Sequence, residues 1–231
     1  MGFFDAHPEF FLSSTTGATP NRLNRRYEAI IDWNRLALRG ARVLDIASHD
    51  GRWSFAALDA GAAYVLGVEA RSRLTECARR NLAPYDSRSW DVITGDIWDA
   101  LPQLSPGGFD VVLCLGFFYH TTEHMRLLGE IKRLKPRWLV IDGLISPLPG
   151  SVIELRKERT SEEAATTDTF ATGLETALVG VPSREALEEM LGSFHLDFEY
   201  FDWHSRGITD WTDIKDYESR TRVTVRCHNL M

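Results

Sequence analysis

Apolar runs of strand length alternate with segments of helical spacing from about residue 40 to the end of the chain. The expected strands lie at residues 43–46, 64–69, 90–97, 109–116, 137–145, 196–203 and 222–227. The run 109–116 (FDVVLCLG) is almost wholly apolar, which is typical of a central parallel strand buried on both faces. Helices are expected between the strands, at 52–60, 71–82, from Thr121 or Thr122 to about 134, and after Pro182 in the pattern 181–191, with Ser183 as the cap. The pattern predicts an α/β fold.

Three segments lie outside this alternation. Residues 1–40 join an aromatic lead to a helical segment at 24–38, which we expect to cap the sheet or to lie over a cleft. Residues 146–180 include a strand-like piece at 152–155 and a polar run at 160–172, and we expect a substrate-side insertion that acts as a lid or is a plain surface loop. Residues 204–219 are expected to fold back or to contact another subunit. We predict one domain over residues 1–231.

The most informative local pattern is an apolar strand that runs directly into the turn formers SHDG at residues 48–51. It resembles the first motif of class I S-adenosylmethionine-dependent methyltransferases, a strand ending in Asp-x-Gly-x-Gly-x-Gly. Asp45 and Gly51 match this motif, whereas Ala47 and His49 stand at its first two glycine positions. Because glycine takes positive φ most readily, Ala47 and His49 must either tolerate the turn or displace the methionine moiety of the cofactor.

The same turn argues against a dinucleotide-dependent oxidoreductase. Such enzymes use Gly-x-Gly-x-x-Gly to bring a pyrophosphate against a helix N-terminus, and residues 45–51 contain no Gly-x-Gly. S-adenosylmethionine carries no phosphate, so a turn poor in glycine harms its binding less.

The resemblance extends over roughly residues 40–228 and implies a Rossmann-like three-layer sandwich, with a seven-stranded, mostly parallel sheet whose last strand is antiparallel. It implies S-adenosylmethionine as the cofactor. In this family an acid at the end of the second strand binds both ribose hydroxyls. Glu69 fits that role, because a carboxylate accepts two charge-assisted hydrogen bonds from a vicinal diol.

The resemblance also suggests contacts for the two ends of the cofactor. Asp96, followed by Ile97, is the candidate on the adenine side. Arg22, Arg26 or Tyr27 would meet the methionine carboxylate if the N-terminal helix lies over the cleft, since guanidinium and carboxylate match in geometry. The full set of expected cofactor-binding residues is Arg26, Asp45, Ala47, Ser48, His49, Gly51, Glu69, Ala70, Arg71, Gly95, Asp96, Ile97, Leu115, Gly116 and Tyr119.

The chemistry is expected where the fourth strand ends, in the turn LGFFYH at residues 115–120. This turn is similar to that of a subset of the superfamily that includes tRNA wobble-uridine carboxymethyltransferases and many bacterial small-molecule or sugar methyltransferases. In the tRNA enzymes its tyrosine touches a carboxylated cofactor, and Tyr119 matches it; Tyr119 would alternatively orient the acceptor. His120 is the expected general base for a hydroxyl acceptor, because histidine titrates near neutral pH. A hydrogen-bonded structural histidine is the alternative.

Two further residues are catalytic candidates. Asp142 ends the fifth expected strand, and His124 begins the following helix of the fourth. They would join His120 around an acceptor or around Mg²⁺, which orients and acidifies the hydroxyl in some O-methyltransferases. Asp142 and His120 would be the ligands, although no diagnostic spacing supports a metal. The turn also lacks the Asp/Asn-Pro-Pro-Tyr sequence of exocyclic-amine methyltransferases, which favours oxygen acceptors and leaves carbon and small-amine acceptors as alternatives.

The composition bears on the expected cellular location and on the state of the cysteines. No apolar run approaches the ~18 residues of a membrane helix, and the first residues lack the pattern of a signal peptide, so we expect a cytoplasmic protein without a membrane partner. The three cysteines are expected to be reduced, with no metal or catalytic role: Cys77, Cys114 and Cys227.

The net charge of −7 argues against a nucleic acid as the main partner, because such binding depends on neutralising phosphates. Two basic clusters are either local patches that could contact a nucleic acid or solvated faces of a helix or an edge strand. They are Arg22, Arg25 and Arg26, and Arg156, Lys157 and Arg159.

These observations favour a methyltransferase that uses S-adenosylmethionine to methylate the oxygen of a small hydroxylated acceptor, a saccharide or a secondary metabolite. An RNA-modifying methyl- or carboxymethyltransferase is one alternative, suggested by LGFFYH and the basic clusters. A degenerate protein that binds the cofactor without turnover is another, suggested by the missing glycines. The aromatic N-terminus and the segment around Trp211 suggest a homodimer.

Overall fold

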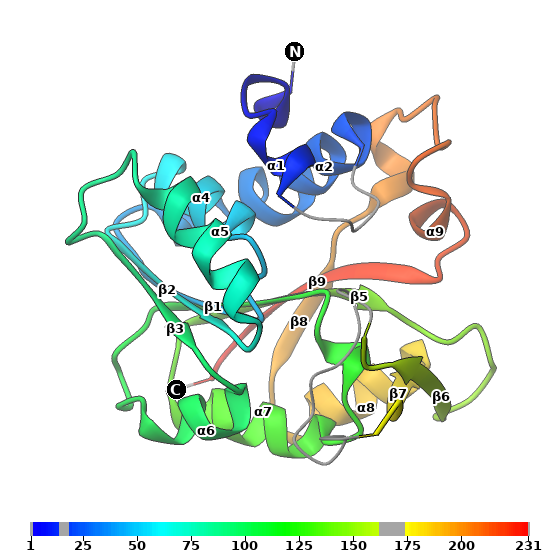
Figure 1. The fold of residues 1–231 in the computed structure, drawn as a ribbon. Helices are drawn as coiled ribbons and strands as arrows, with labels where there is room; N and C mark the ends of the chain where they lie inside the picture. The colour runs from blue at the N-terminus through cyan, green and yellow to red at the C-terminus, as the bar shows by residue number, and fades with distance from the viewer. Residues whose placement is uncertain (1, 14–18, 162–173, 231) are drawn as a thin grey trace.

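The central sheet is the frame on which the candidate site is built. The computed structural model describes residues 2–13, 19–161 and 174–230. Within these ranges seven strands form one sheet in the order β3-β2-β1-β4-β5-β9-β8 (Figure 1). They are β1 (Arg42–Ile46), β2 (Tyr64–Glu69), β3 (Trp90–Thr94), β4 (Val111–Leu115), β5 (Trp138–Leu144), β8 (Asp197–Tyr200) and β9 (Arg222–His228). Strands β1 to β5 are parallel and β9 is antiparallel to β5 and β8, which confirms the predicted sheet.

Helices cover both faces of the sheet and make three layers (Figure 1). One face carries α1 (Glu9–Leu12), α2 (Pro20–Tyr27), α4 (Arg52–Asp59) and α5 (Ser72–Leu82). The other carries α6 (Ile97–Ala100), α7 (His124–Arg133) and α8 (Arg184–Ser193). Because side chains alternate along a strand, Val43 of β1 packs in the first layer's core, whereas Leu44 and Ile46 pack in the second.

The N-terminal helical segment is less regular than its sequence predicts. Helix α2 begins after Thr19, whose hydroxyl accepts the backbone N–H of Arg22 at 3.1 Å. It continues through a π-helical turn, Glu28–Asp32, and a separate short helix α3, Arg35–Leu38. The predicted helix at 24–38 is therefore three consecutive helical pieces.

Two predicted boundaries are shifted in the structure. The predicted third strand to residue 97 is wrong at its end, because the Asp96 carboxylate accepts the backbone N–H of Trp98 at 2.9 Å and starts α6 at Ile97. The helix predicted after Pro182 is α8, which starts at Arg184, where it was expected. Its predicted cap is confirmed, because Ser183 accepts the N–H of Ala186 at 3.1 Å. Helix α7 begins at His124, beyond the threonines expected to cap it.

The predicted insertion contains a two-stranded hairpin, β6 (Ile153–Arg159) and β7 (Thr176–Pro182), separate from the main sheet. The polar run expected to be a lid, 160–172, falls almost entirely outside the described residues. The segment 204–219 folds back on the domain through a short helix, α9 (Lys215–Glu218), and a cluster that brings Ile214 and Tyr217 against Ala29. Folding back is thus one of the two outcomes expected for this segment.

Two expectations from composition can be compared with the described residues. None of their helices combines the length and apolarity that crossing a membrane requires. All three cysteines are buried and unbonded to one another, and burial raises the pKa of the Cys114 and Cys227 thiols to about 12. Those two thiols are poor nucleophiles at neutral pH.

Candidate active site

The turn between β1 and α4 has the backbone of a glycine-rich loop although two glycines are missing. Ala47, His49 and Gly51 all take positive φ, at 52°, 54° and 77°. These are the three positions at which the resembling motif has glycine. Ala47 and His49 therefore tolerate the turn, at a cost of about 1–2 kcal/mol for each L-residue in the left-handed region. Gly51 has an additional packing reason, since a Cβ there would lie 3.1 Å from Cβ of Ala78 on α5.

Glu69 ends β2 and faces this turn. Its Oε2 accepts the backbone N–H of His49 at 3.0 Å, and its Oε1 accepts that of Arg71 at 2.9 Å. The residue is 7% exposed. Each carboxylate oxygen has a second lone pair, so the group can accept two more hydrogen bonds from a ligand at this edge.

Asp45 is the buried acid at the start of the turn. Its carboxylate accepts a hydrogen bond from the Ser54 hydroxyl at 2.7 Å. Its pKa is raised to about 7, mainly by burial and also by the nearby carboxylates of Glu69 and Asp50, against the lowering effect of the hydrogen bonds from Ser54. A cationic group placed nearby would favour its ionised form.

Asp50 is a second buried acid, and it ties the turn to the N-terminal segment. It forms a bidentate pair with Arg52, with Nε and Nη2 each 2.7 Å from a carboxylate oxygen. The Ser13 hydroxyl donates to the same carboxylate, and the carbonyl of Phe10 accepts from Arg52. Burial alone would raise the pKa of Asp50, but His49 and Arg52 hold it well below its usual range. Asp50 and Arg52 were not among the predicted site residues.

Four other predicted residues line the edge beside Glu69. Ser48 packs on β2, where a Cβ on Gly67 would lie 2.7 Å from its hydroxyl oxygen, and that hydroxyl has no hydrogen-bond partner among the described residues. Ala70 follows Glu69 directly. The backbone N–H of Gly95 donates to the Glu69 carbonyl at 2.9 Å. Arg71 Nη2 donates to the Thr160 carbonyl at 3.3 Å, at the end of the inserted hairpin.

The end of β4 carries the predicted catalytic turn. After the buried Leu115, Gly116 takes a φ of 80° and donates its N–H to the Asp142 carbonyl at 2.7 Å. A 3₁₀ turn, Phe118–His120, follows. Tyr119 lies over β5, where a Cβ on Gly143 would be 3.2 Å from its ring. The ring centroids of Tyr119 and His120 are 4.2 Å apart, so the side chains of these two predicted residues lie against each other.

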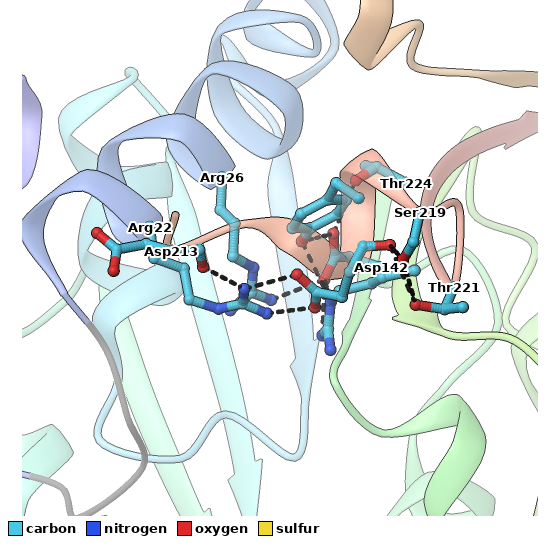
Figure 2. A network of polar contacts seen from close by, with 10 residues as sticks. Arg22, Arg26, Asp142, Asp213, Ser219, Thr221 and Thr224 are labelled. Atoms are coloured by element: carbon cyan, nitrogen blue, oxygen red, sulfur yellow. Dashed lines mark hydrogen bonds and ion pairs between the residues drawn. The ribbon is translucent and has the colours of Figure 1, made fainter. Parts of the chain in front are cut away.

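Asp142 does not serve the role predicted for it. Its side chain is fully buried, and Oδ1 pairs with Arg26 at 2.8 Å and with Arg222 at 2.8 and 2.9 Å (Figure 2). The hydroxyls of Tyr217 and Thr224 donate to Oδ2, each at 2.7 Å. These four partners leave no oxygen facing an acceptor or a metal ion. Although burial raises its pKa, the two arginines hold the pKa of Asp142 far below the usual range.

The same network places Arg26, the residue predicted to meet the methionine carboxylate. Its Nη2 is bound to Asp142, and its guanidinium lies 5.1 Å from the Trp53 ring centroid. Its Nε is buried and lacks a hydrogen-bond partner among the described residues. The neighbouring Arg22 binds Asp216 and the Asp213 carbonyl instead, which fastens α2 to the segment that contains α9 (Figure 2).

His124 has a structural environment. It is 1% exposed, its Nε2 lies 3.0 Å from the Gly180 carbonyl, and its ring lies 4.9 Å from that of Phe118. Burial lowers its pKa. In the described parts of the chain, no group of three or more His, Cys, Asp or Glu side chains could hold a metal ion. The predicted arrangement of His120, His124 and Asp142 around an ion is therefore not found.

Comparison with known sequences supports a methyltransferase domain in part of the chain. Residues 43–136 match the family model described as a methyltransferase domain. The ubiquinone biosynthesis O-methyltransferase of Neisseria meningitidis serogroup C (strain 053442) is 29% identical over 119 residues, which are 51% of this chain and 50% of that protein. The chain thus aligns with about half the length of this curated relative.

Similar solved structures cover more of the chain. The N-terminal domain of EvdMO1, solved in the presence of S-adenosylhomocysteine (SAH) and D-fucose, has a TM-score of 0.63 at 19% identity and covers 93% of this chain and 84% of its own. The DhpI–SAH complex has a TM-score of 0.60 at 13% identity, and the match covers 98% of this chain and 93% of the DhpI chain. The chain therefore shares the Rossmann-like fold of these SAH-bound proteins, and residues 43–136 are similar in sequence to a methyltransferase domain.

Proposed function

We propose that the protein is an S-adenosylmethionine-dependent methyltransferase that methylates a hydroxyl oxygen of a small acceptor, a saccharide or a secondary metabolite. The observation that carries the proposal is the left-handed turn at residues 47, 49 and 51 facing the Glu69 carboxylate. The match of residues 43–136 to a methyltransferase domain supports it.

The residues at this edge fit the cofactor. Glu69 keeps two lone pairs for a ribose diol. Burial raises the pKa of Asp45, and a cationic cofactor bound nearby would favour its ionised form. The buried Ser48 hydroxyl and Arg26 Nε are polar atoms for which the described residues offer no partner. Glu69, Asp45, Ser48 and the backbone of the turn would hold the cofactor, and Arg26 Nε would face its carboxylate.

When bound, S-adenosylmethionine would supply a methyl group on a sulfonium: a nucleophile attacks the methyl carbon in line, the bond from that carbon to sulfur breaks, and S-adenosylhomocysteine leaves. The protein therefore mainly has to align the acceptor and exclude water. His120 would take the proton that the acceptor hydroxyl loses as its oxygen bonds to the methyl carbon. Tyr119, whose ring is 4.2 Å from that of His120, would orient the acceptor.

Charge and relatives favour a small acceptor over RNA. The first basic cluster is engaged by carboxylates, because Arg22 binds Asp216, Arg25 binds Glu28 and Arg26 binds Asp142. With a net charge of −7, little of the cluster's charge is left to bind phosphates. The similar EvdMO1 domain was solved with D-fucose, and the curated relative is named an O-methyltransferase.

A second candidate function is the transfer of a carboxymethyl group from a carboxylated form of the cofactor. One observation favours it: the buried Arg222 and the partly buried Arg26 face the single carboxylate of Asp142, which leaves an excess positive charge. Arg222 also lies 5.6 Å from the ring centroid of Tyr119, close to Gly116 at the end of β4. An anion on the donor would compensate this charge.

Methyl transfer to catechol and to D-fucose, followed by mass spectrometry, tests the proposal. We expect methylated product, and a decrease in kcat of about 10²-fold or more in His120→Gln with cofactor affinity retained. Product formed only from the carboxylated donor would favour the second candidate. Cofactor binding with no product from either donor would favour the protein without turnover.

A further inference from the structure

Glu158 is a charged residue of the inserted hairpin that lies directly beside the candidate base. Its Oε2 is 2.7 Å from Nδ1 of His120. The two side chains are 23% and 13% exposed, so the contact is largely shielded from water. Glu158 lies 38 residues beyond His120 in the sequence. It belongs to β6, which is outside the main sheet.

Backbone contacts hold the hairpin against the catalytic turn. The N–H of Gly180 on β7 donates to the Thr121 carbonyl at 3.1 Å, and the Gly180 carbonyl contacts His124 Nε2 at 3.0 Å. A Cβ on Gly180 would lie 2.8 Å from Ile153 and 2.9 Å from the His124 ring, so this close approach requires glycine. Glu158 pairs in register with Ala177 of β7, three residues before this anchor.

The contact determines which nitrogen of His120 is available. In a neutral imidazole one nitrogen donates and the other accepts. A carboxylate accepts only, so Glu158 fixes the proton on Nδ1 and leaves the lone pair on Nε2. The same carboxylate stabilises the imidazolium that forms when Nε2 takes a proton.

We propose that Glu158 is a positioning residue for His120, so that the β6–β7 hairpin is part of the catalytic apparatus and not only a cover for the acceptor. The proposal rests on the proposed function, in which His120 is the base. The far end of the same hairpin binds Arg71 through Thr160, next to Glu69. The insertion thus contacts both the base and the cofactor edge.

Long-range proton–nitrogen NMR of the imidazole rings tests the proposal without an acceptor, with His120→Gln used to assign the signals. We expect neutral His120 to carry its proton on Nδ1 in the wild type. In Glu158→Leu the signals should move to the Nε2–H form that free histidine favours. The matched control is Glu154→Leu on the same strand, because Glu154 binds Ser146 and Arg156, and it should leave the His120 signals unchanged.

Kinetics with the probe acceptors gives the second readout. Glu158→Leu should lower kcat by about 10²-fold, with KM for the acceptor within about twofold of wild type, because the base is misdirected while binding is kept. If Glu158→Leu fails to fold, Glu158→Gln keeps an acceptor atom without the charge and should lower kcat while keeping the Nδ1–H form. An unchanged tautomer in Glu158→Leu, or an unchanged kcat in either variant, overturns the proposal. Failure of the proposed function is seen separately, as absent cofactor binding or absent product in the wild type.

Discussion

The left-handed conformation of Ala47 makes a measurable prediction about stability. Ala47 has a φ of 52°, whereas Ala60, at the end of α4, has a φ of −70°. Replacing each by glycine removes the same methyl group and adds the same backbone freedom to the unfolded chain. The difference between the two variants therefore reports the cost of the left-handed region at position 47.

The magnitude follows from that cost. An L-residue in the left-handed region loses about 1–2 kcal/mol, and glycine avoids this loss. Glycine in place of an alanine of ordinary conformation destabilises by about 0.5–1 kcal/mol. Ala60→Gly should therefore lose about 0.5–1 kcal/mol of unfolding free energy, while Ala47→Gly should be neutral or stabilised by up to about 1.5 kcal/mol.

Urea unfolding followed by circular dichroism measures both variants against the wild type. We expect the unfolding free energy of Ala47→Gly to exceed that of Ala60→Gly by about 1–2 kcal/mol, which corresponds to a difference in Tm of roughly 2–8 °C for a domain of this size. Ala47→Val should have the opposite effect and lower the unfolding free energy, because a β-branched residue is least tolerant of positive φ. Equal losses in the two glycine variants would refute the assigned backbone of the turn.

Three further substitutions test buried groups. Asp142→Asn should lower the unfolding free energy measured in urea by about 3–5 kcal/mol, because the buried Arg222 and the partly buried Arg26 lose their counter-ion. Since the pKa of Asp142 is lowered on folding, its contribution exists above about pH 4 and is lost as the pH falls, so the deficit of the variant should shrink in acid. Asp45 has a pKa raised to about 7 in the folded protein, so the fold loses stability as the pH rises from about 4 to 7, where the carboxyl ionises in the unfolded chain but stays protonated in the folded one. Asp45→Asn should gain roughly 2 kcal/mol of unfolding free energy relative to wild type between pH 5 and pH 8, and a difference that does not change with pH would disprove this. Gly51→Ala should lose about 1–3 kcal/mol, from a φ of 77° and a Cβ 3.1 Å from Ala78, and an unfolding midpoint equal to wild type would contradict that packing.

The sequence predicts the sheet well because its signals are local. Central strands such as β4 are continuous apolar runs, and these appear in the structure where they were expected. Errors arise where one side chain overrides the run. Ile97 continues an apolar strand pattern, yet the carboxylate of Asp96 caps a helix at that point.

The candidate site is predicted less completely because its decisive contacts join distant residues. Asp142 has the residue type and position of a functional acid, but Arg26 and Arg222, 116 and 80 residues away in the sequence, enclose it. Their charges alone do not say which carboxylates they meet. Glu158 was missed for the same reason, since its contact with His120 depends on how an inserted hairpin docks.

The turn shows the limit of reading motifs by residue type. Two glycines are replaced, which made a degenerate site a reasonable alternative. The backbone nevertheless takes positive φ at all three positions, because neighbouring contacts hold it there: Glu69 accepts the N–H of His49, and Ser48 donates its N–H to the Val68 carbonyl at 2.9 Å. The glycine pattern is one way to obtain this conformation and not a requirement for it.

Calorimetric titration with S-adenosylmethionine tests the central claim, that this turn and Glu69 form a cofactor site. We expect binding by the wild type and by Glu185→Gln, a control on the exposed face of α8. Glu69→Gln should weaken binding by about 10–100-fold, because charge-assisted hydrogen bonds of about 1.5–3 kcal/mol are lost. No binding by the folded wild type, or equal affinity in Glu69→Gln, would contradict the account.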